Sequence, residues 1–177
     1  MPTSKARIIV TGLVGLYPLG GVAYDYFQYF LGLDRLGYDV YYHEDSSSWP
    51  YNPVERQSSA DGTYSATFIS EFIQCYAPSL NEKWHYRHLH ELSFGMSQSR
   101  FEEVSRTADI FFNISGACHI PESLSPHCIK VFLDTDQTCF SELLIHLEKS
   151  FSDITLYFED NTFSSSSNRS SYLKVKV

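Results

Sequence analysis

The hydrophobic and polar positions at the start of the chain follow the order of a strand, a loop, a helix and a second strand. Residues 8–10 are a short β-branched run, as expected of a strand buried on both faces of a parallel sheet. Residues 22–36 contain one glycine and no proline, and their polar side chains share one stripe, which predicts a helix. The strand pattern returns at residues 39–42. We therefore predict a βαβ unit over residues 7–42.

Apolar runs and amphipathic stretches continue to alternate along the chain. Residues 46–62 are rich in Ser, Pro, Asn and Asp and indicate a long surface loop. Residues 81–94 are rich in aromatic side chains and His, and their pattern favours neither a helix nor a strand. The order of elements predicts an α/β protein, a Rossmann-like three-layer α/β/α fold with a mainly parallel sheet. The remaining predicted helices lie at residues 64–76, 99–107 and 140–149, and the remaining strands at residues 109–114, 130–133 and 154–158.

Length and C-terminal composition set the expected domain boundaries. A chain of 177 residues is long enough for one ordinary domain, which buries roughly 70% of the surface its unfolded chain exposes. The C-terminal end is a Ser-rich polar run whose composition does not support a packed core. We therefore predict one Rossmann-like domain at residues 1–162 and a disordered tail at residues 163–177.

Charge and apolar content exclude several classes of partner. The net charge of -8 argues against nucleic acid and against an anionic membrane surface. No apolar run approaches the roughly 18 residues of a membrane span, and the N-terminus has no charged-then-apolar leader. The four cysteines form no CxxC pair, which favours free thiols in a reducing compartment. We expect a cytoplasmic protein.

Candidate site residues follow the predicted strands, because the carboxyl ends of parallel strands form the binding edge of such a sheet. A glycine pair before a helix lets the backbone approach a phosphate or a sugar, and the helix dipole favours negative charge there. Carboxylates at the same edge bind hydroxyl groups or act as a general base. Glycines that only form a turn and aspartates that only cap helices are the structural alternative. The candidates are Gly20, Gly21, Glu44, Asp45, Ser115, Gly116, His119, Asp134 and Asp136.

A nucleotide-cofactor site is the first alternative function. Residues 11–15 begin like the TGxxGxxG loop of short-chain dehydrogenases, and Glu44 or Asp45 would bind the ribose. However, Pro18 takes the place of the third glycine, and the loop before the helix is longer than this motif allows. A YxxxK match lies in the Ser-rich tail instead of a helix. These departures disfavour an NAD(P)-binding dehydrogenase.

A metal site is a further alternative. His85, His88 and His90 lie close together, but no HExxH motif is present because no second His follows Glu91 at the required spacing. Histidines interleaved with Trp and Tyr are more typical of a partly buried surface. We predict no metal ion.

Three segments resemble the N-terminal domain of GT-B glycosyltransferases, most closely an uncharacterised bacterial group. In chain order they are YPLGGVAYDYFQYFLGLDRLGYDVYYHED with WPYNP, ADIFFNISGA and KVFLDTD, and they span most of residues 7–136. The first segment is long and specific, and the other two are short but correctly placed. The resemblance implies the N-terminal half of a GT-B fold.

The resemblance also implies a function and roles for the candidates. Such enzymes transfer a sugar from a nucleotide sugar, their co-substrate, to an acceptor, with no metal and no further cofactor. Carried onto this chain, Gly20 and Gly21 match the glycine-rich loop, and Asp134 and Asp136 match the aspartates that face the cleft. The motifs do not fix the catalytic base, for which Asp25, His119 and Asp136 are the candidates.

The donor-binding half of the family has no counterpart in these 177 residues. We therefore expect the acceptor-side half of a glycosyltransferase, truncated, inactive alone and dependent on a separate C-terminal domain. The alternative within the same fold is a module that binds a sugar or nucleotide without catalysis. The motifs specify neither the donor sugar nor the acceptor.

Overall fold

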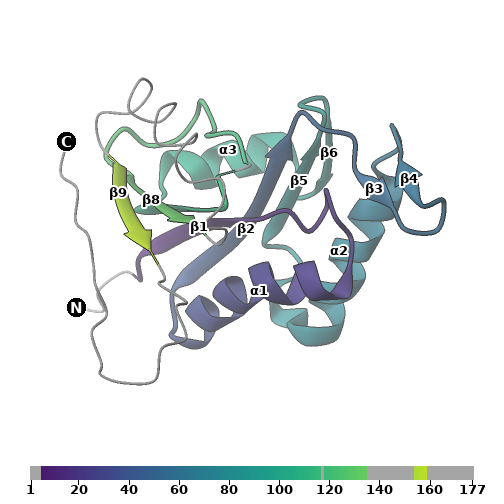
Figure 1. Cartoon of the computed structure of the whole chain (residues 1–177). Coiled ribbons are helices and arrows are strands. Elements are labelled where there is room, and N and C mark those ends of the chain that lie inside the picture. The colour runs from purple at the N-terminus through teal and green to yellow at the C-terminus, as the bar shows by residue number, and fades with distance from the viewer. Residues whose placement is uncertain (1–4, 117, 135–153, 159–177) are drawn as a thin grey trace, which may run out of the picture.

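The computed structural model describes residues 5–116, 118–134 and 154–158 (Figure 1). Three predictions fall outside these residues: the helix at 140–149, the tail at 163–177 and the candidate base Asp136. The helices are α1 (Gly20–Arg35), α2 (Thr63–Tyr76), a 3-10 turn (Pro78–Leu80) and α3 (Gln98–Arg106). The strands are β1 (Arg7–Thr11), β2 (Asp39–Ser46), β3 (Tyr51–Asn52), β4 (Gln57–Ser58), β5 (Trp84–His88), β6 (Leu92–Gly95), β7 (Ile110–Ile114), β8 (Ile129–Asp134) and β9 (Ile154–Phe158).

The main sheet confirms the predicted α/β architecture. Its seven strands lie in the order β6-β5-β2-β1-β7-β8-β9, and only β6 pairs antiparallel with its neighbour. From β1 the chain adds β2 and β5 on one side, then returns to add β7, β8 and β9 on the other. This is the order of a doubly wound Rossmann-like sheet with one antiparallel edge strand.

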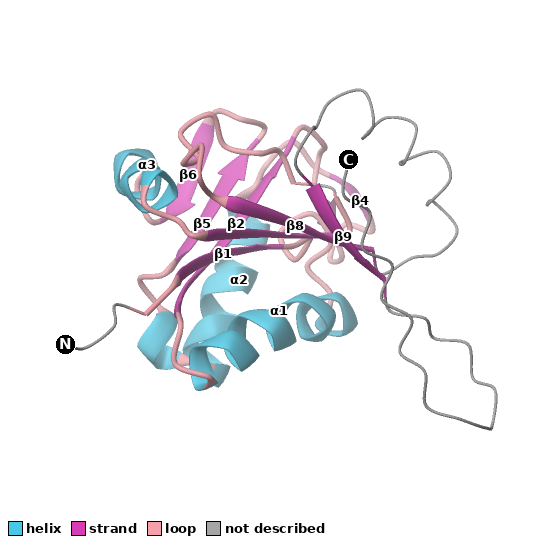
Figure 2. Cartoon of the chain, turned by 90° about the vertical axis from the view of Figure 1, so that its left-hand side faces the viewer, coloured by secondary structure: helices cyan, strands magenta, loops and turns pink. Residues whose placement is uncertain are grey.

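Helices cover both faces of the sheet, which makes three layers (Figure 2). Helices α1 and α2 lie on one face and α3 lies on the other. A right-handed crossover between parallel strands places its helix on opposite faces when the direction of winding reverses, as it does after β6. The core on the α1 side is rich in aromatic side chains, whereas the core on the α3 side is smaller and includes Ile9, Tyr41, Met96, Phe101, Val104 and Phe111.

The period-two alternation of β2 assigns its side chains to the two faces. Val40 and Tyr42 belong to the α1-side core, and Tyr41 belongs to the α3-side core. Phe27 of α1 packs against Tyr42 with ring centroids 4.9 Å apart. Burial of each such side chain contributes about 1.5–3 kcal/mol to stability. The same alternation sends Glu44 towards the α1 side and His43 and Asp45 towards α3.

Local structure differs from the sequence predictions in three segments. Helix α1 begins at Gly20 instead of residue 22, so Gly20 and Gly21 form its first turn and are exposed. Residues 84–95, which matched no regular pattern, form the strands β5 and β6. The turn between them has positive φ at Leu89 (50°) and His90 (63°), a conformation that non-glycine residues rarely adopt. A second hairpin, β3–β4, lies within the segment predicted as a loop.

Candidate functional site

The loop between β1 and α1 is closed by a carboxylate of the protein itself. The Glu44 side chain is fully buried, and the backbone N–H groups of Gly15 and Leu16 donate to its two oxygens at 2.7 Å each. Tyr42 donates its hydroxyl to the same carboxylate at 2.7 Å. Burial raises the pKa of Glu44 to about 7, although these three donors act to lower it. The loop amides that a phosphate would need are thus occupied by Glu44.

The glycines of this loop serve close packing. A Cβ at Gly12 would lie 2.8 Å from the Tyr42 hydroxyl oxygen, and one at Gly15 would lie 2.9 Å from the Tyr86 ring. A Cβ at Gly20 or Gly21 would meet no atom within 4 Å. The side chains therefore require glycine at the two earlier positions and leave the later pair facing open space.

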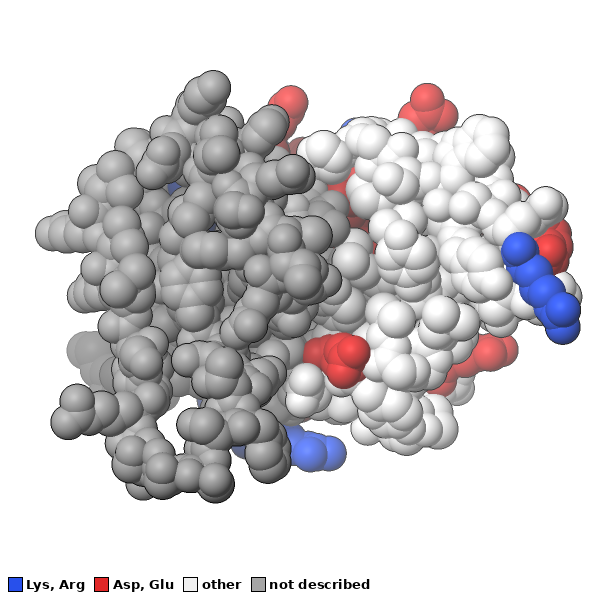
Figure 3. Space-filling view, viewed as in Figure 1, with Lys and Arg blue, Asp and Glu red and all other residues white. Residues whose placement is uncertain are grey.

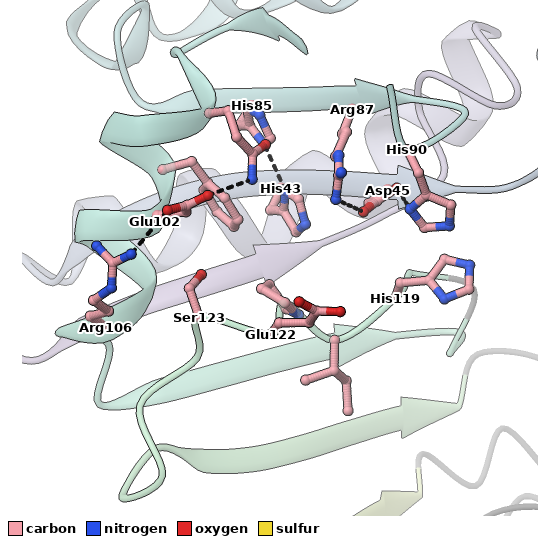
Figure 4. Close-up of a pocket in the computed structure, with 14 residues that line it drawn as sticks. His43, Asp45, His85, Arg87, His90, Glu102, Arg106, His119, Glu122 and Ser123 are labelled. Atoms are coloured by element: carbon pink, nitrogen blue, oxygen red, sulfur yellow. Dashed lines mark hydrogen bonds and ion pairs between the residues drawn. The ribbon is translucent and has the colours of Figure 1, made fainter. Parts of the chain in front are cut away.

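A polar crevice lies on the other face of β2, between β5, α3 and the segment that follows β7 (Figure 4). Its volume is about 540 Å³, within the range of small-molecule sites. Strand β2 contributes His43 and Asp45, and β5 contributes His85 and Arg87. The remaining lining residues include His90, Gln98, Phe101, Glu102, Arg106, His119 and Glu122.

Two histidines meet at one end of this crevice, beside the carboxyl end of β2. The Asp45 side chain is 7% exposed, and its Oδ1 lies 2.8 Å from His90 Nδ1. That oxygen has no hydrogen bond of regular geometry among the described residues, and its close contact is with the His90 ring. Arg87 lies 3.6 Å from the second Asp45 oxygen, so charge of both signs surrounds this end.

A serine hydroxyl lies between the two histidines. The rings of His90 and His119 are 4.4 Å apart, edge to face. Both Nε2 atoms contact the hydroxyl of Ser47, at 2.8 Å from His90 and 3.1 Å from His119. The end of the crevice therefore brings a hydroxyl, two imidazoles and a carboxylate together.

A chain of hydrogen bonds runs from β2 across β5 and β6 to α3. The Nδ1 atoms of His43 and His85 lie 3.1 Å apart, and His85 Nε2 lies 3.1 Å from Ser93 Oγ. Gln98 donates through its amide nitrogen to Glu102 at 3.2 Å, which leaves its oxygen to accept from Ser93 at 3.4 Å. Ser93 therefore accepts from His85 Nε2–H, and His43 donates from Nδ1.

The two imidazoles of this chain are neutral. Burial and the neighbouring His85 hold the pKa of His43 well below its usual range. Burial and the charge of Arg87 lower the pKa of His85 to about 4. Both rings stack on Phe101, with centroids 4.0 and 4.5 Å away. His43 Nε2 is buried and has no hydrogen-bond partner among the described residues, so it adds an unpaired lone pair to the crevice wall.

Two of the site residues predicted from the sequence line the crevice. Asp45 and His119 line it together, and the His119 backbone N–H donates to the Asp45 carbonyl at 3.0 Å. Asp25 is exposed on α1, the helix on the opposite face of the sheet. The Ser115 hydroxyl accepts from Tyr26 at 3.0 Å, which ties β7 to α1.

The other predicted residues lie at strand ends, in a turn, on β2 or in the first turn of α1. Gly116 has a positive φ of 67° in the turn that ends β7, where the absence of a Cβ is favourable. Asp134 is the last residue of β8. Glu44 lies on β2 and closes the β1–α1 loop, and Gly20 and Gly21 lie in the first turn of α1.

Sequence reasoning missed most of the crevice. It considered His85 and His90 only as metal ligands, and it did not select His43, Arg87 or Ser47. Period-two alternation could have paired His43 with Asp45 and His85 with Arg87, once residues 84–88 were taken as a strand. No local sequence pattern indicates the contacts between β5, α3 and residues 119–123.

Metal-site geometry, helix composition, surface charge and comparisons with known proteins place few further constraints on the function. Within the described part of the chain no three His, Cys, Asp or Glu side chains are grouped as a metal site, and none of its helices combines the length and apolar composition of a membrane span. On the face in Figure 3 the described surface is mainly uncharged, with scattered acidic groups. Comparison of the chain with protein-family models, curated proteins and solved structures gave no match.

Proposed function

We propose that this chain is the acceptor-binding half of a GT-B-type glycosyltransferase. In this proposal the crevice beside α3 holds a hydroxyl-rich acceptor, and a second Rossmann-like domain brings the nucleotide sugar to the same edge of the sheet. The doubly wound strand order supports the proposal, because ligands of such folds bind outside the carboxyl ends of the strands. The lining supports it too, since carboxylate, imidazole and guanidinium groups between them donate to and accept from sugar hydroxyls.

The pair of Asp45 and His90 is the observation that carries this proposal. The Asp45 carboxylate lies against His90 Nδ1 and favours the proton on that nitrogen, so the Nε2 atom is left with a lone pair, which faces the hydroxyl of Ser47. Sugar transfer to an alcohol requires that the acceptor hydroxyl lose its proton. We therefore assign His90 as the general base and Asp45 as the residue that positions it. His119 lies beside the same Ser47 hydroxyl, and in this proposal an acceptor hydroxyl that takes the place of the Ser47 hydroxyl is oriented by His119.

The closed loop argues against a dinucleotide cofactor as the alternative. A phosphate that bound the amides of Gly15 and Leu16 would displace the buried Glu44 carboxylate, whose oxygens already accept from both. It would also place a second negative charge beside the first. The crevice on the opposite face requires no such displacement.

Direct acceptor binding tests the proposal. We expect free mono- and disaccharides to give saturation-transfer NMR signals with the intact chain, whereas NAD(P) gives none. His119→Ala should weaken sugar binding about tenfold or more, because it removes one hydrogen bond between the protein and the sugar inside a polar site. His127→Ala is the matched control, since His127 is an exposed histidine of the same segment and does not line the crevice.

Three results would contradict the proposal. The first is stronger binding of NAD(P) than of any sugar. The second is an equal effect of the two histidine variants on sugar binding. The third is efficient sugar transfer from a nucleotide sugar by this chain alone, because the donor would then not need a second domain.

A further inference from the structure

The hydroxyl that the His90 imidazole faces belongs to the protein. Ser47 directly follows β2, is exposed, and its Oγ lies 2.8 Å from His90 Nε2. On the other side of the imidazole, Nδ1 lies 2.8 Å from the Asp45 carboxylate. A hydroxyl, an imidazole and a buried carboxylate thus stand in a row, each pair at hydrogen-bond distance.

The positions of the protons on Ser47 and His90 follow from the Asp45 carboxylate beside them. With the Asp45 oxygen as the acceptor on the Nδ1 side of the ring, His90 carries its proton on Nδ1 and presents a lone pair at Nε2. Ser47 then donates its hydroxyl proton to His90, and its oxygen is free to accept from His119 Nε2–H at 3.1 Å. One imidazole is placed to remove the serine proton, while the other is placed to donate to the oxygen.

Backbone geometry holds this arrangement in place. His90 and Leu89 have φ of 63° and 50°, a left-handed conformation that non-glycine residues rarely adopt. That turn returns the His90 ring towards β2. The backbone of His119 is bound to β2 through the Asp45 carbonyl at 3.0 Å. The three side chains that make up the surroundings of Ser47 are therefore fixed to a strand or a tight turn.

We propose that Ser47, His90 and Asp45 form a nucleophilic triad that cleaves carboxylic esters. The order of hydroxyl, imidazole and carboxylate, and the roles assigned to them, follow those of serine hydrolases, although no GxSxG motif is present. The inference concerns an activity of its own and does not require the chain to transfer sugars.

The reaction needs only the ester and water. Ser47 Oγ bonds to the carbonyl carbon, its proton passes to His90 Nε2, and the carbonyl oxygen takes the π electron pair and accepts from His119 N–H. The C–O bond to the alcohol then breaks, and the alcohol leaves with the proton from His90. Water attacks the acyl-serine through the same base, which releases the carboxylic acid and restores Ser47.

The crevice next to the triad indicates the alcohol part of the substrate. Arg87, Glu102, Arg106 and Glu122 line it, so it favours a polar alcohol with several hydroxyl groups over an apolar chain. Ser47 itself is exposed at the end of the crevice, where a small acyl group has room. The substrate class we infer is a short-chain acyl ester of a sugar or another polyol.

Active-site labelling and ester hydrolysis test the triad on the intact chain. We expect a fluorophosphonate reagent to modify Ser47, as mapped by peptide mass spectrometry on the unaltered protein. With p-nitrophenyl acetate as substrate, Ser47→Ala and His90→Ala should each lower the hydrolysis rate at least about 100-fold. Ser48→Ala and His127→Ala are matched exposed controls and should leave the rate within about twofold.

Equal hydrolysis by the unaltered chain and the Ser47→Ala variant would overturn the proposal, because free imidazoles would then explain the activity. Modification of Ser48 in place of Ser47 would also overturn it. Labelling of Ser47 that disappears in His90→Ala would support it even if a variant were less stable. Sugar binding separates this inference from the proposed function, because Ser47→Ala should bind saccharides as the unaltered chain does.

Discussion

The two faces of strand β2 use their polar side chains in opposite ways. On the α1 side, Glu44 is enclosed and its oxygens are bound by the β1–α1 loop and by Tyr42. On the α3 side, His43 and Asp45 reach a crevice of about 540 Å³. Among the described helices, α1 and α2 lie on the first face and the nine-residue α3 lies on the second (Figure 2). The same strand therefore holds one polar group in a fully hydrogen-bonded structural role and presents others to a crevice that a ligand can enter.

The buried polar groups on the two faces of β2 also change the stability of the protein in opposite directions as pH rises. The pKa of Glu44 is raised to about 7 by burial, so the stability linked to its proton is complete below about 4.5 and is lost as pH rises through 7. The pKa of His43 and of His85 is lowered by burial, so their contribution is complete above about 6.5 and is lost as pH falls. Between about pH 4.5 and pH 6.5, a rise in pH lowers the stability through Glu44 and raises it through His43 and His85, so the two effects offset each other.

Glu44→Gln should give the largest change and should separate the two faces. At pH 5 we expect a loss of about 2 kcal/mol in the free energy of unfolding, because the amide of the glutamine cannot accept from both Gly15 and Leu16. As pH rises from 4.5 to 7, the unfolded form of the unaltered chain ionises Glu44 while the folded form keeps the carboxyl protonated, which lowers its free energy of unfolding by about 3 kcal/mol. The stabilities should therefore cross, and the Glu44→Gln variant is expected to be no less stable than the unaltered chain at pH 8.

Urea unfolding at several pH values measures this difference. Glu103→Gln is the matched control, since Glu103 is exposed on α3, and its stability should follow the unaltered chain throughout. A Glu44→Gln deficit that stays constant from pH 5 to pH 8 would show that Glu44 does not hold a proton in the folded protein.

Gly15→Ala should give the next largest effect, a loss of about 2 kcal/mol. The added Cβ would lie 2.9 Å from the Tyr86 ring and 3.2 Å from a Glu44 oxygen, so the closed loop would have to shift. Gly21→Ala faces open space at the start of a helix and should stabilise the protein by about 0.5 kcal/mol. Thermal unfolding of both variants checks the contrast, and a loss at Gly21 equal to that at Gly15 would refute it.

Ser93→Ala should give the smallest effect, and it acts on the α3 side. It removes the acceptor of His85 Nε2–H, so we expect a loss of about 1 kcal/mol at pH 7 by urea unfolding. Ser99→Ala provides an exposed control on the first turn of α3 and should change the stability by less than about 0.5 kcal/mol. Equal stability of the unaltered chain and Ser93→Ala would mean that the hydrogen-bond chain from His43 ends at His85.

The chain's own pattern was enough to predict most of the sheet. β-branched and aromatic runs identified β1, β2, β7, β8 and β9, because strands of a parallel sheet are buried on both faces and need apolar side chains throughout. The pattern failed for residues 84–95, where His and Arg interrupt the apolar run. His85 and Arg87 of this segment line the crevice, so the departure from the strand pattern marks the site itself.

By itself, the sequence determined the α/β class, the βαβ unit at its start and the edge of the sheet where polar side chains gather. Only the tertiary structure decided the use of each group. Adjacent carboxylates, Glu44 and Asp45, lie on opposite faces because successive side chains of a strand point in opposite directions. The Glu44 carboxylate accepts from the amides of the glycine loop. Asp45 contacts His90, which in turn contacts Ser47, because the turn between β5 and β6, far along the chain, places His90 there. Local sequence cannot specify such a meeting, because it depends on how β5 pairs with β2.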